Sequence, residues 1–594
     1  MKKLFPYFKS YKKESILGPL FKLLEATFEL LVPVVVGLIV DIGLGEGVLS
    51  GAKRVYPNAN KGFIFGMCGV LVLFAFVGFL CAVTAQYFAA KAATGVSSKV
   101  RRALFKKLQS LSYSDLDKLG TSAILTRMTG DVNQFQSGIN LFLRLFLRSP
   151  FIVFGAMIAA FFISVKAGLI FLVTIPLLSV VVFSIMLITM PLHKKSREKL
   201  DKVLLSTREN LDGARVIRAF CKEEDEKILF AQRNQELTKS RSFADGVSAL
   251  MNPLTYILIN FAVIALLYLG GVEVKLGSLS QGSVIALYNL MTQILVELIK
   301  LANLIVTMTK AAACGNRIEE ILQMQSSLQF KDEMAFNEDT PPSDDEYIRF
   351  EGVTLCYHEG ADSALSDISF SVRKGETLGI IGGTGSGKTS LVNLLPHFYD
   401  VTKGRVLFAG KDVASYDLKT LRSKISIVPQ KSTLFLGTIK DNLLWGGNAS
   451  DDQLWAALKA AQADGFVKEK GGLDAPVEQG GKNFSGGQRQ RLCVARALVK
   501  QAEVLILDDS SSALDYATEA AMRGAIEDFD QNLTTIIVSQ RASSLKRADK
   551  IVVLDEGKAV GIGTHEELKK SCPVYREIYR SQYPEEYEEG GENA

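Results

Sequence analysis

Long apolar stretches fill the first half of the chain, whereas the second half mixes apolar and polar residues as a soluble domain does. Six of these stretches reach the length of about 20 mostly apolar residues that a helix needs to cross a bilayer core. Two of them, Phe63–Val83 and Phe151–Ile163, are apolar on every face, which favours lipid-facing helices over the buried helices of a large soluble protein. The predicted membrane spans are residues 16–43, 61–90, 137–164, 167–192, 246–272 and 282–310.

The connections between the predicted spans alternate in length and differ in charge. Those after the second and fourth spans run to roughly 50 residues each and carry dense Lys and Arg in Lys99–Lys107 and His193–Lys202. The positive-inside rule places both long connections in the cytosol. The connection 44–60 carries Lys53 and Arg54, a weak signal in the opposite direction. An even number of spans returns the chain to the cytosol, so both termini are expected there.

Both long connections are rich in helix-forming residues and poor in proline. We therefore expect the flanking helices to continue far past the membrane as two hairpins, with tips near Tyr113–Asp117 and Leu211–Phe220. The basic N-terminus, residues 1–15, contains interleaved aromatic side chains and no signal-peptide cleavage site. This pattern predicts a short amphipathic helix at the cytoplasmic membrane surface, with a frayed basic tail as the alternative.

The second half predicts one soluble domain joined to the spans by a linker. Residues 326–345 include an acidic stretch with two adjacent prolines, which is typical of a linker. Over residues 346–580, apolar strand-like runs alternate with helical patterns, as in a parallel sheet covered by helices. Residues 581–594 form an acidic tail. The predicted fold class is an α-helical membrane domain over residues 16–325 followed by an α/β domain.

Composition excludes some functions. The net charge of +5 over 594 residues is small and gives no reason to expect a nucleic-acid partner. None of the seven cysteines forms a C-x-x-C pair, so we expect neither a metal cluster nor a disulfide framework, and we interpret the cysteines as small buried apolar residues.

A phosphate-binding loop is the first chemical motif of the second half. Residues 378–389 read LGIIGGTGSGKT, a buried-strand run followed by a G-x-x-x-x-G-K-T loop that opens a helix. The glycines allow backbone N–H groups to surround a β-phosphate, Lys388 neutralises phosphate charge, and the Thr389 hydroxyl can ligate Mg²⁺. The predicted nucleotide contacts are Gly382, Gly383, Thr384, Gly385, Ser386, Gly387, Lys388, Thr389 and Ser390.

Two further motifs follow the loop. Residues 504–508, VLILD, predict a buried strand ending in Asp508, whose carboxylate can hold Mg²⁺ on the side opposite Thr389. Between the two motifs, the sequence FSGGQ starts a helix with Ser485 as N-cap and with glycines that expose N–H groups to an anion. The predicted contacts of this third motif are Ser485, Gly486, Gly487 and Gln488.

The order of the three motifs resembles the ATP-binding cassette (ABC) superfamily, and the six preceding spans with long cytosolic hairpins resemble its multidrug-exporter type of half-transporter. The likeness covers nearly the whole chain. It implies a P-loop NTPase fold for residues 346–580, ATP and Mg²⁺ as ligands, and a multi-pass protein of a cell membrane, with bacterial origin expected. It also implies an ATP-hydrolysing translocase that exports amphipathic drugs or lipid-like compounds by alternating access. The loops 112–132 and 211–226 are similar to the family's hairpins, whose short tip helices dock on the cassettes.

The resemblance assigns roles to further residues. Tyr357 matches the aromatic residue that stacks on adenine. Gln430 matches the residue that senses Mg²⁺ and the attacking water and contacts the membrane domain, so it is both a nucleotide-site and a metal candidate. Glu478 matches a loop that touches the hairpin tips, and Ser512–Asp515 matches the loop that crosses the interface between two cassettes.

Two positions depart from the family's pattern. After Asp508 the family places a glutamate that polarises the attacking water, but this chain has Asp509, whose carboxylate is retracted by about 1.5 Å. The family's switch histidine is replaced by Gln540, which can hydrogen-bond but cannot carry charge. We expect this chain's own site to bind ATP and hydrolyse it poorly, and its intact signature motif to complete the competent site of a partner in a heterodimer. A homodimer with two slow sites and an ABC-type gated or regulatory protein are the alternatives.

Charged and polar residues inside the predicted spans have two interpretations. They either pair with one another and reach toward the membrane surface, or they form a polar patch in a transport cavity that favours cationic amphipathic compounds. The residues concerned are Glu25 and Glu29 in the first span, Arg144 and Arg148 in the third, and Gln293, Glu297 and Lys300 in the sixth.

Overall fold

The computed structural model describes residues 4–43, 61–328, 346–357, 362–510 and 512–584. The chain divides into two compact units. The membrane unit comprises Met1–Ser110 and Gly120–Met324, and the cassette unit comprises Leu111–Leu119 and Gln325–Ala594. The predicted tip of the first hairpin therefore groups with the cassette unit. In the sequence it lies within residues 16–325, the predicted membrane domain. The linker beyond residue 328, the connection 44–60 and the tail beyond residue 584 lie outside the described residues.

Six helical stretches of the described membrane unit are long and apolar enough to cross a bilayer, which confirms the six predicted spans. They are Phe5–Gly43, Lys61–Leu108, Thr121–Ile163, Val165–Asp212, Glu223–Lys275 and Gln281–Gln323. The main helices within them are α2 (Lys12–Leu38), α3 (Lys61–Leu108), α6 (Val132–Leu145), α7 (Arg148–Ile163), α8 (Val165–Asp212), α10 (Glu223–Ala249), α11 (Met251–Lys275) and α12 (Gln281–Gln323).

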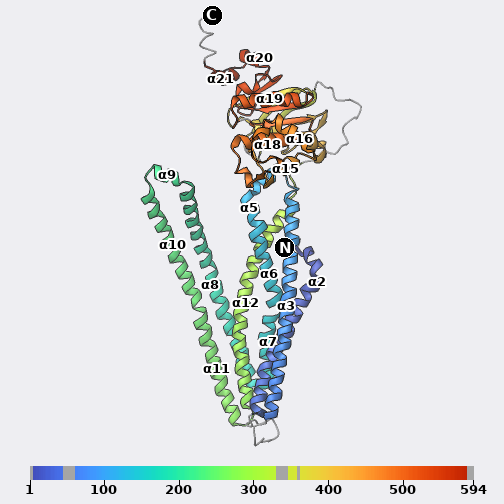
Figure 1. The fold of residues 1–594 in the computed structure, drawn as a ribbon. Helices are drawn as coiled ribbons and strands as arrows, with labels where there is room; N and C mark the ends of the chain where they lie inside the picture. The colour runs from blue at the N-terminus through green and yellow to red at the C-terminus, as the bar shows by residue number, and fades with distance from the viewer. Residues whose placement is uncertain (1–3, 44–60, 329–345, 358–361, 511, 585–594) are drawn as a thin grey trace. The chain divides into compact units, whose positions relative to one another are not determined.

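The long connections are helical as predicted. α3 and α8 each continue unbroken for 48 residues, and the tips carry the short helices α4 (Tyr113–Leu119), α5 (Thr121–Thr126) and α9 (Ala214–Ala219). α8 and α10 run side by side toward α9, and their ends near α9 diverge from the bundle in which α12 packs on α2, α6 and α7, while α8 also contacts α7 and α12 (Figure 1).

The predicted third and fifth spans are interrupted. α6 ends at Leu145 and α7 starts at Arg148, while α10 ends at Ala249 and α11 starts at Met251. Pro150 and Pro253 lie in the first turns of the second helix of each pair. Proline lacks an N–H and its ring clashes with the carbonyl four residues before it, so it starts a new helix instead of continuing the old one.

The N-terminal segment packs on α3 instead of forming a frayed tail. It comprises α1 (Phe5–Phe8) and a 3₁₀ turn (Lys9–Tyr11) that leads directly into α2. The Tyr11 ring lies directly against Gly95 of α3, where an added Cβ would lie 2.2 Å from the ring, so a larger residue there would displace the Tyr11 side chain. Lys91 of α3 pairs with Glu14 at 3.1 Å.

The cassette unit contains the predicted parallel sheet and, in addition, a four-stranded antiparallel sheet and a two-stranded one of β7 (Gly437–Thr438) and β8 (Pro476–Val477), which the sequence pattern did not indicate. The six-stranded sheet has the order β12-β11-β3-β10-β9-β6, in which only the edge strand β12 is antiparallel to its neighbour. Its strands are β3 (Thr377–Gly382), β6 (Ile425–Val428), β9 (Val504–Asp508), β10 (Thr534–Val538), β11 (Lys550–Asp555) and β12 (Lys558–Gly563). The four-stranded antiparallel sheet, β2-β1-β4-β5, contains β1 (Ile348–Leu355), β2 (Leu365–Val372), β4 (Lys403–Phe408) and β5 (Lys411–Asp412).

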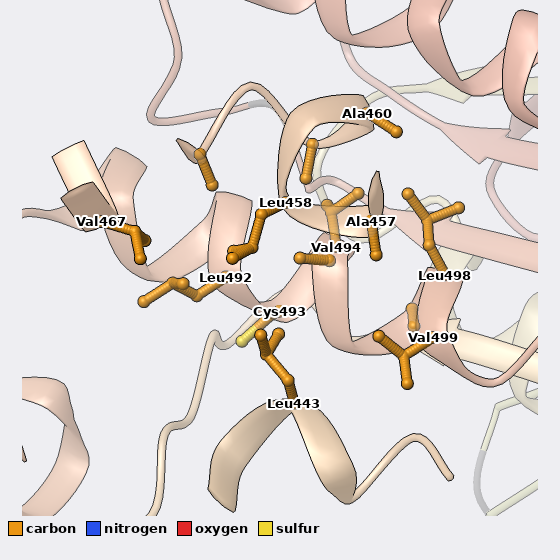
Figure 2. Close-up of a cluster of buried hydrophobic side chains, with 14 of the residues drawn as sticks. Leu443, Ala457, Leu458, Ala460, Val467, Leu492, Cys493, Val494, Leu498 and Val499 are labelled. Carbon is orange, nitrogen blue, oxygen red and sulfur yellow. The ribbon is translucent and has the colours of Figure 1, made fainter. Parts of the chain in front are cut away.

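The cassette unit also contains the helices α13 (Lys388–Leu394), α14 (Leu418–Lys424), α15 (Ile439–Leu444), α16 (Asp451–Ala460), α17 (Asp464–Glu469), α18 (Gly486–Val499), α19 (Tyr516–Phe529), α20 (His565–Ser571) and α21 (Pro573–Gln582). Helices such as α13 and α18 pack on the parallel sheet and carry the motifs, while α16 packs on α17, α18 and α19. Side chains of α15, α16, α17 and α18 gather in one buried cluster (Figure 2). Leu458 and Val494 in that cluster are both 0% exposed, and full burial of such a side chain contributes about 1.5–3 kcal/mol. This packing fixes α18, whose first turn carries the signature motif.

The interpretation of the cysteines is partly wrong. Cys81, Cys314, Cys493 and Cys572 are buried, but Cys68 and Cys221 are exposed.

Candidate functional site

The loop from β3 to α13 favours glycine at three of its positions: Gly382 through a close approach, Gly385 through a φ of +82°, and Gly387 through both. Gly387 has a φ of +94°, and a Cβ there would lie 2.7 Å from a backbone carbonyl oxygen. A Cβ at Gly382 would lie 2.2 Å from another carbonyl oxygen. At Gly383 and Gly385, by contrast, an added Cβ would meet nothing within 4 Å. The loop is thus packed tightly at its two ends and open between them, where its N–H groups can reach a phosphate.

Lys388 lies at the first position of α13 and points back across this loop. Its Nζ donates to the carbonyl oxygens of Gly382 at 2.9 Å and Gly383 at 2.6 Å. Burial lowers the pKa of Lys388, while Asp509 and Asp508 act in the opposite direction. A desolvated ammonium group held over the loop is well suited to pair with a phosphate oxygen.

Oxygen atoms suited to Mg²⁺ meet beside the loop. Thr389 Oγ1 donates to Asp508 Oδ1 at 3.1 Å, and Asp508 is 2% exposed at the end of β9. Burial raises the pKa of Asp508, and neighbouring Asp509 adds to the rise. A hydroxyl and a carboxylate brought together in this way fit the hard oxygen ligands that Mg²⁺ prefers, and a bound cation would favour the ionised form of Asp508.

Asp509 and Gln430 also lie at this site. Asp509 has a φ of +47°, and its N–H donates to the Val538 carbonyl oxygen at 3.0 Å. Gln430 Nε2 donates to Asp509 Oδ2 at 3.3 Å. This hydrogen bond connects Gln430 and Asp509, the two residues that the resemblance places beside the attacking water.

Gln540 follows β10 with an exposed side chain, and its carbonyl oxygen accepts from Gln582 Nε2 at 2.8 Å.

Tyr357 lies next to the loop helix. Its hydroxyl donates to Ser390 Oγ at 2.8 Å, and its ring is 37% exposed, which leaves a face for an adenine ring to stack on. Tyr399 meets it edge to face, with ring centroids 5.1 Å apart at 87°.

The helix α4, from the tip of the first hairpin, packs against the same aromatic group. The Tyr113 ring packs against Phe398 in a tilted arrangement, with centroids 4.5 Å apart at 39°. The Tyr399 hydroxyl donates to Asp117 Oδ2 at 2.8 Å. Burial raises the pKa of Tyr399 and the bond to Asp117 adds to the rise, so the hydroxyl remains a donor. Because Tyr399 also touches Tyr357, α4 and the predicted adenine-stacking residue share one neighbour.

The start of α4 is tied to the chain that follows α12. Asp115, 4% exposed, accepts from Ser112 Oγ at 2.7 Å and from the Ser327 N–H at 2.9 Å. Burial by itself raises the pKa of Asp115, but the hydrogen bonds outweigh it, and the net pKa is lowered. The carboxylate thus joins the hairpin tip to the beginning of the linker.

The signature motif starts α18 as predicted. Ser485 and Gln488 form a capping box, with Gln488 N–H donating to Ser485 Oγ at 3.2 Å. Gln490, 5% exposed, donates to Ser512 Oγ and accepts from the Ala513 N–H, both at 3.1 Å. Gln490 therefore connects the signature helix to the predicted interface loop. In the described cassette, no hydrogen bond or ion pair joins Ser485–Gln488 to the phosphate loop of the same chain.

Sequence reasoning did not identify Tyr399, Asp115 or Gln490. Tyr399 and Asp115 bond to residues 282 and 212 positions away, and Gln490 bonds to a loop 22 positions away. The only sequence signal was the aromatic pair Phe398-Tyr399 shortly after α13. Glu478 has an exposed side chain, and its contact with a hairpin tip stays a prediction.

Five of the six charged candidates of the spans form ion pairs. Among the described residues Arg144 forms no ion pair, and its buried Nε and the buried Oε1 of Gln293 have no hydrogen-bond partner. Arg148 donates to Glu29 at 2.5 Å and to Glu297 at 2.8 Å, and Lys300 donates to Glu297 at 2.8 Å. Glu25 pairs with Lys22 at 2.5 Å. These contacts favour internal ion pairing over an acidic lining that attracts cations.

Comparison with known proteins agrees with this architecture. Residues 15–298 match the family described as the ABC transporter transmembrane region, and residues 365–512 match the family described as ABC transporter. The chain is 35% identical to an uncharacterised ABC transporter ATP-binding protein of Mycobacterium tuberculosis, over 97% of each chain. It is 32% identical to an ATP-dependent lipid A-core flippase of Desulfotalea psychrophila, over 81% of this chain and 84% of the relative. A solved bacterial Atm1-family ABC exporter with ATP bound has a TM-score of 0.76 at 22% identity, covering 96% of this chain and 98% of its own.

Six apolar spans joined to a cassette with a phosphate loop and a signature helix define an ATP-driven membrane transporter. The chain belongs to the ABC transporter family, and its relatives are half-transporters of the exporter type. It is a multi-pass membrane protein with its ATP-binding domain in the cytosol.

Proposed function

We propose that this half-transporter binds ATP at its own phosphate loop but hydrolyses it slowly, and that its signature motif completes the competent site of a partner half-transporter. The observation that carries the proposal is Asp509. Its carboxylate lies where a catalytic glutamate is expected and is already engaged by Gln430 at 3.3 Å. A glutamate would extend about 1.5 Å further toward the phosphates, and a displacement of this size is enough to misplace an in-line water.

The remaining residues of the site support binding. The open glycine loop would hold the phosphates, Lys388 would pair with their charge, and Thr389 with Asp508 would hold Mg²⁺. The bound Mg²⁺ would supply charge neutralisation at the phosphates. With Gln540 in place of a histidine, no group at this position can carry positive charge to the γ-phosphate. The site would therefore retain nucleotide affinity and lack two groups that promote hydrolysis.

The exposed Ser485 and the open first turn of α18 support the second half of the proposal. In this arrangement the signature faces the nucleotide of the other chain, and closure of the two cassettes on ATP drives the hairpins and the spans between two states. A homodimer would join two slow sites and would turn over ATP slowly at both.

We further propose that the substrates are amphipathic drugs or lipid-like compounds. The relatives that support this class are the lipid A-core flippases of Desulfotalea psychrophila and Photobacterium profundum, the latter 28% identical over 98% of this chain.

The proposal is tested by ATPase assays on the full-length chain, purified alone and with a candidate partner that carries glutamate and histidine at the matching positions. In the assembled pump, Asp509→Ala should leave turnover within about twofold, whereas Ser485→Ala should reduce it by about 100-fold or more, as expected when a transition-state contact is lost. The reverse pattern, or fast turnover by the chain alone that Asp509→Ala abolishes, would refute the slow-site assignment.

A further inference from the structure

A basic pocket of about 560 Å³ lies in the membrane unit between α8, α10 and α12. Lys194 and Arg197 of α8, Arg241 of α10 and Lys310 of α12 line it, together with a single carboxylate, Asp245 of α10. The pocket is formed by side chains of three helices that are far apart in the sequence.

Most of the positive charge in this pocket has no counter-charge. Arg241 pairs with Asp245 at 3.8 Å. For Lys194, Arg197 and Lys310, no described carboxylate lies within ion-pair distance. Cations near the cytosolic membrane surface are common and normally spread along a helix in water. Here three unpaired cations from two helices line one cavity, and their mutual repulsion is relieved when an anion binds.

The same pocket has an apolar part. Met190, Leu200, Leu237 and Val306 complete its wall. The predicted fourth span ends at residue 192, just before the cationic turn of α8, so the pocket lies where the apolar part of that helix gives way to its charged part. An amphiphile with an anionic head matches both parts, because its head can meet the cations while its first methylene groups contact the apolar wall.

We propose that this pocket binds the phosphate-containing or carboxylate-containing head of an anionic amphiphile on the cytosolic side of the membrane. The inference deepens the proposed export function and rests on it for the step that follows binding. It also reverses the expected charge preference, since the candidate carboxylates Glu25, Glu29 and Glu297 are paired, whereas the pocket is lined by cations without a counter-charge.

The test measures binding of phosphatidylglycerol to the full-length protein in detergent by native mass spectrometry, with phosphatidylcholine of the same acyl chains as the neutral probe. Arg197→Gln and Lys310→Gln should each weaken phosphatidylglycerol binding by about fivefold, because one basic residue near an anionic lipid contributes about 1 kcal/mol. The double variant should lose about 25-fold, and phosphatidylcholine binding should not change. Lys202→Gln and Lys239→Gln are the matched controls, since these exposed lysines of α8 and α10 do not line the pocket.

Several outcomes would overturn the inference. They are equal binding of the two lipids by the wild type, full retention of phosphatidylglycerol by the double variant, and equal loss in the control variants. Inorganic phosphate that displaces the lipid at comparable concentration would show a site for a free anion instead of an amphiphile. Loss of partner assembly with phosphatidylglycerol binding retained would show that the cations pair with the partner chain.

Two measurements distinguish the pocket assignment from the export proposal: lipid binding tests the pocket, and ATP turnover of the assembled pump tests export. If phosphatidylglycerol binds the wild type, is lost from the double variant and stimulates ATP turnover of the assembled pump, both are supported. If it binds in the same pocket but leaves ATP turnover unchanged, the pocket assignment stands and the lipid-export proposal fails.

Discussion

Replacing Tyr399 with phenylalanine isolates one hydrogen bond between the cassette and the hairpin helix α4. The Tyr399 hydroxyl donates to Asp117 at 2.8 Å, while its ring contacts Tyr113 at 6.3 Å and Tyr357 at 5.1 Å. Phenylalanine keeps both ring contacts and removes only the donor. Any effect of the substitution therefore reports the hydrogen bond and not the packing.

The expected magnitude follows from the charge and exposure of the acceptor. A hydrogen bond to a charged group contributes about 1.5–3 kcal/mol. Asp117 is exposed, so water replaces part of the lost bond and the lower value applies. A loss of about 1.5 kcal/mol corresponds to a rise of about tenfold in the equilibrium constant for the local opening of α4. The ring contact between Tyr113 and Phe398 remains, so α4 opens more often without detaching.

Hydrogen exchange of the full-length protein measures this opening directly. Backbone amides of residues 113–119 should exchange about tenfold faster in Tyr399→Phe. ATP affinity should stay within about twofold, because the ring that faces Tyr357 is unchanged, and transport per ATP hydrolysed should fall in the assembled pump. Tyr416→Phe is the matched control, since it removes a 2.8 Å hydrogen bond to the Phe408 carbonyl oxygen elsewhere in the cassette.

Two results would refute this reasoning. Unchanged exchange across residues 113–119 in Tyr399→Phe would show that the hydrogen bond does not hold α4. An equal acceleration in Tyr416→Phe would show a general loosening of the cassette.

Two further predictions concern the metal ligands and the core. Because burial raises the pKa of Asp508, protons compete with Mg²⁺ for its carboxylate at higher pH than at an ordinary aspartate. The Mg²⁺-dependent ATP affinity should therefore fall as pH decreases from neutral. Asp508→Asn should remove that pH dependence, as measured by nucleotide-binding assays with and without Mg²⁺. A flat wild-type profile would contradict this. Leu458→Ala removes a side chain that is 0% exposed and should destabilise the cassette by about 2–5 kcal/mol. The full-length protein should then show a lower midpoint of thermal unfolding. Leu436→Ala is the control, since Leu436 is 77% exposed and its loss should leave the midpoint unchanged.

Local patterns were sufficient to predict the elements that depend on local sequence. Apolar length predicted six spans, and the strand-loop-helix pattern at 378–389 predicted β3 and α13. The interruption before α7 was not predicted, although its cause, Pro150, is visible in the sequence. The four-stranded antiparallel sheet was missed because half-buried strands such as β1 show no continuous apolar run.

The contacts that complete the site could not be predicted because they depend on tertiary structure. Tyr399 and Asp117 are 282 residues apart, and Arg148 and Glu297 are 149 residues apart. A sequence pattern can place a charge within a span, but it does not reveal which opposite charge folds against it. For this reason the two interpretations of the span charges stayed open until their partners were known.

Two groups of charges in the membrane unit differ in their surroundings, the ion-paired residues of the spans and the cations of the basic pocket. An unpaired charge at the centre of a membrane helix costs about 2.5–3.5 kcal/mol on insertion scales, and Arg148 and Lys300 avoid this cost by pairing with Glu29 and Glu297. Exposed cations of the basic pocket remain in contact with water and do not incur that cost. On this proposal the pocket selects an anionic amphiphile at the cytosolic membrane edge, while Arg148 and Lys300 stay paired within the spans. We therefore assign charge selection to the pocket and structural pairing to the carboxylates of the spans.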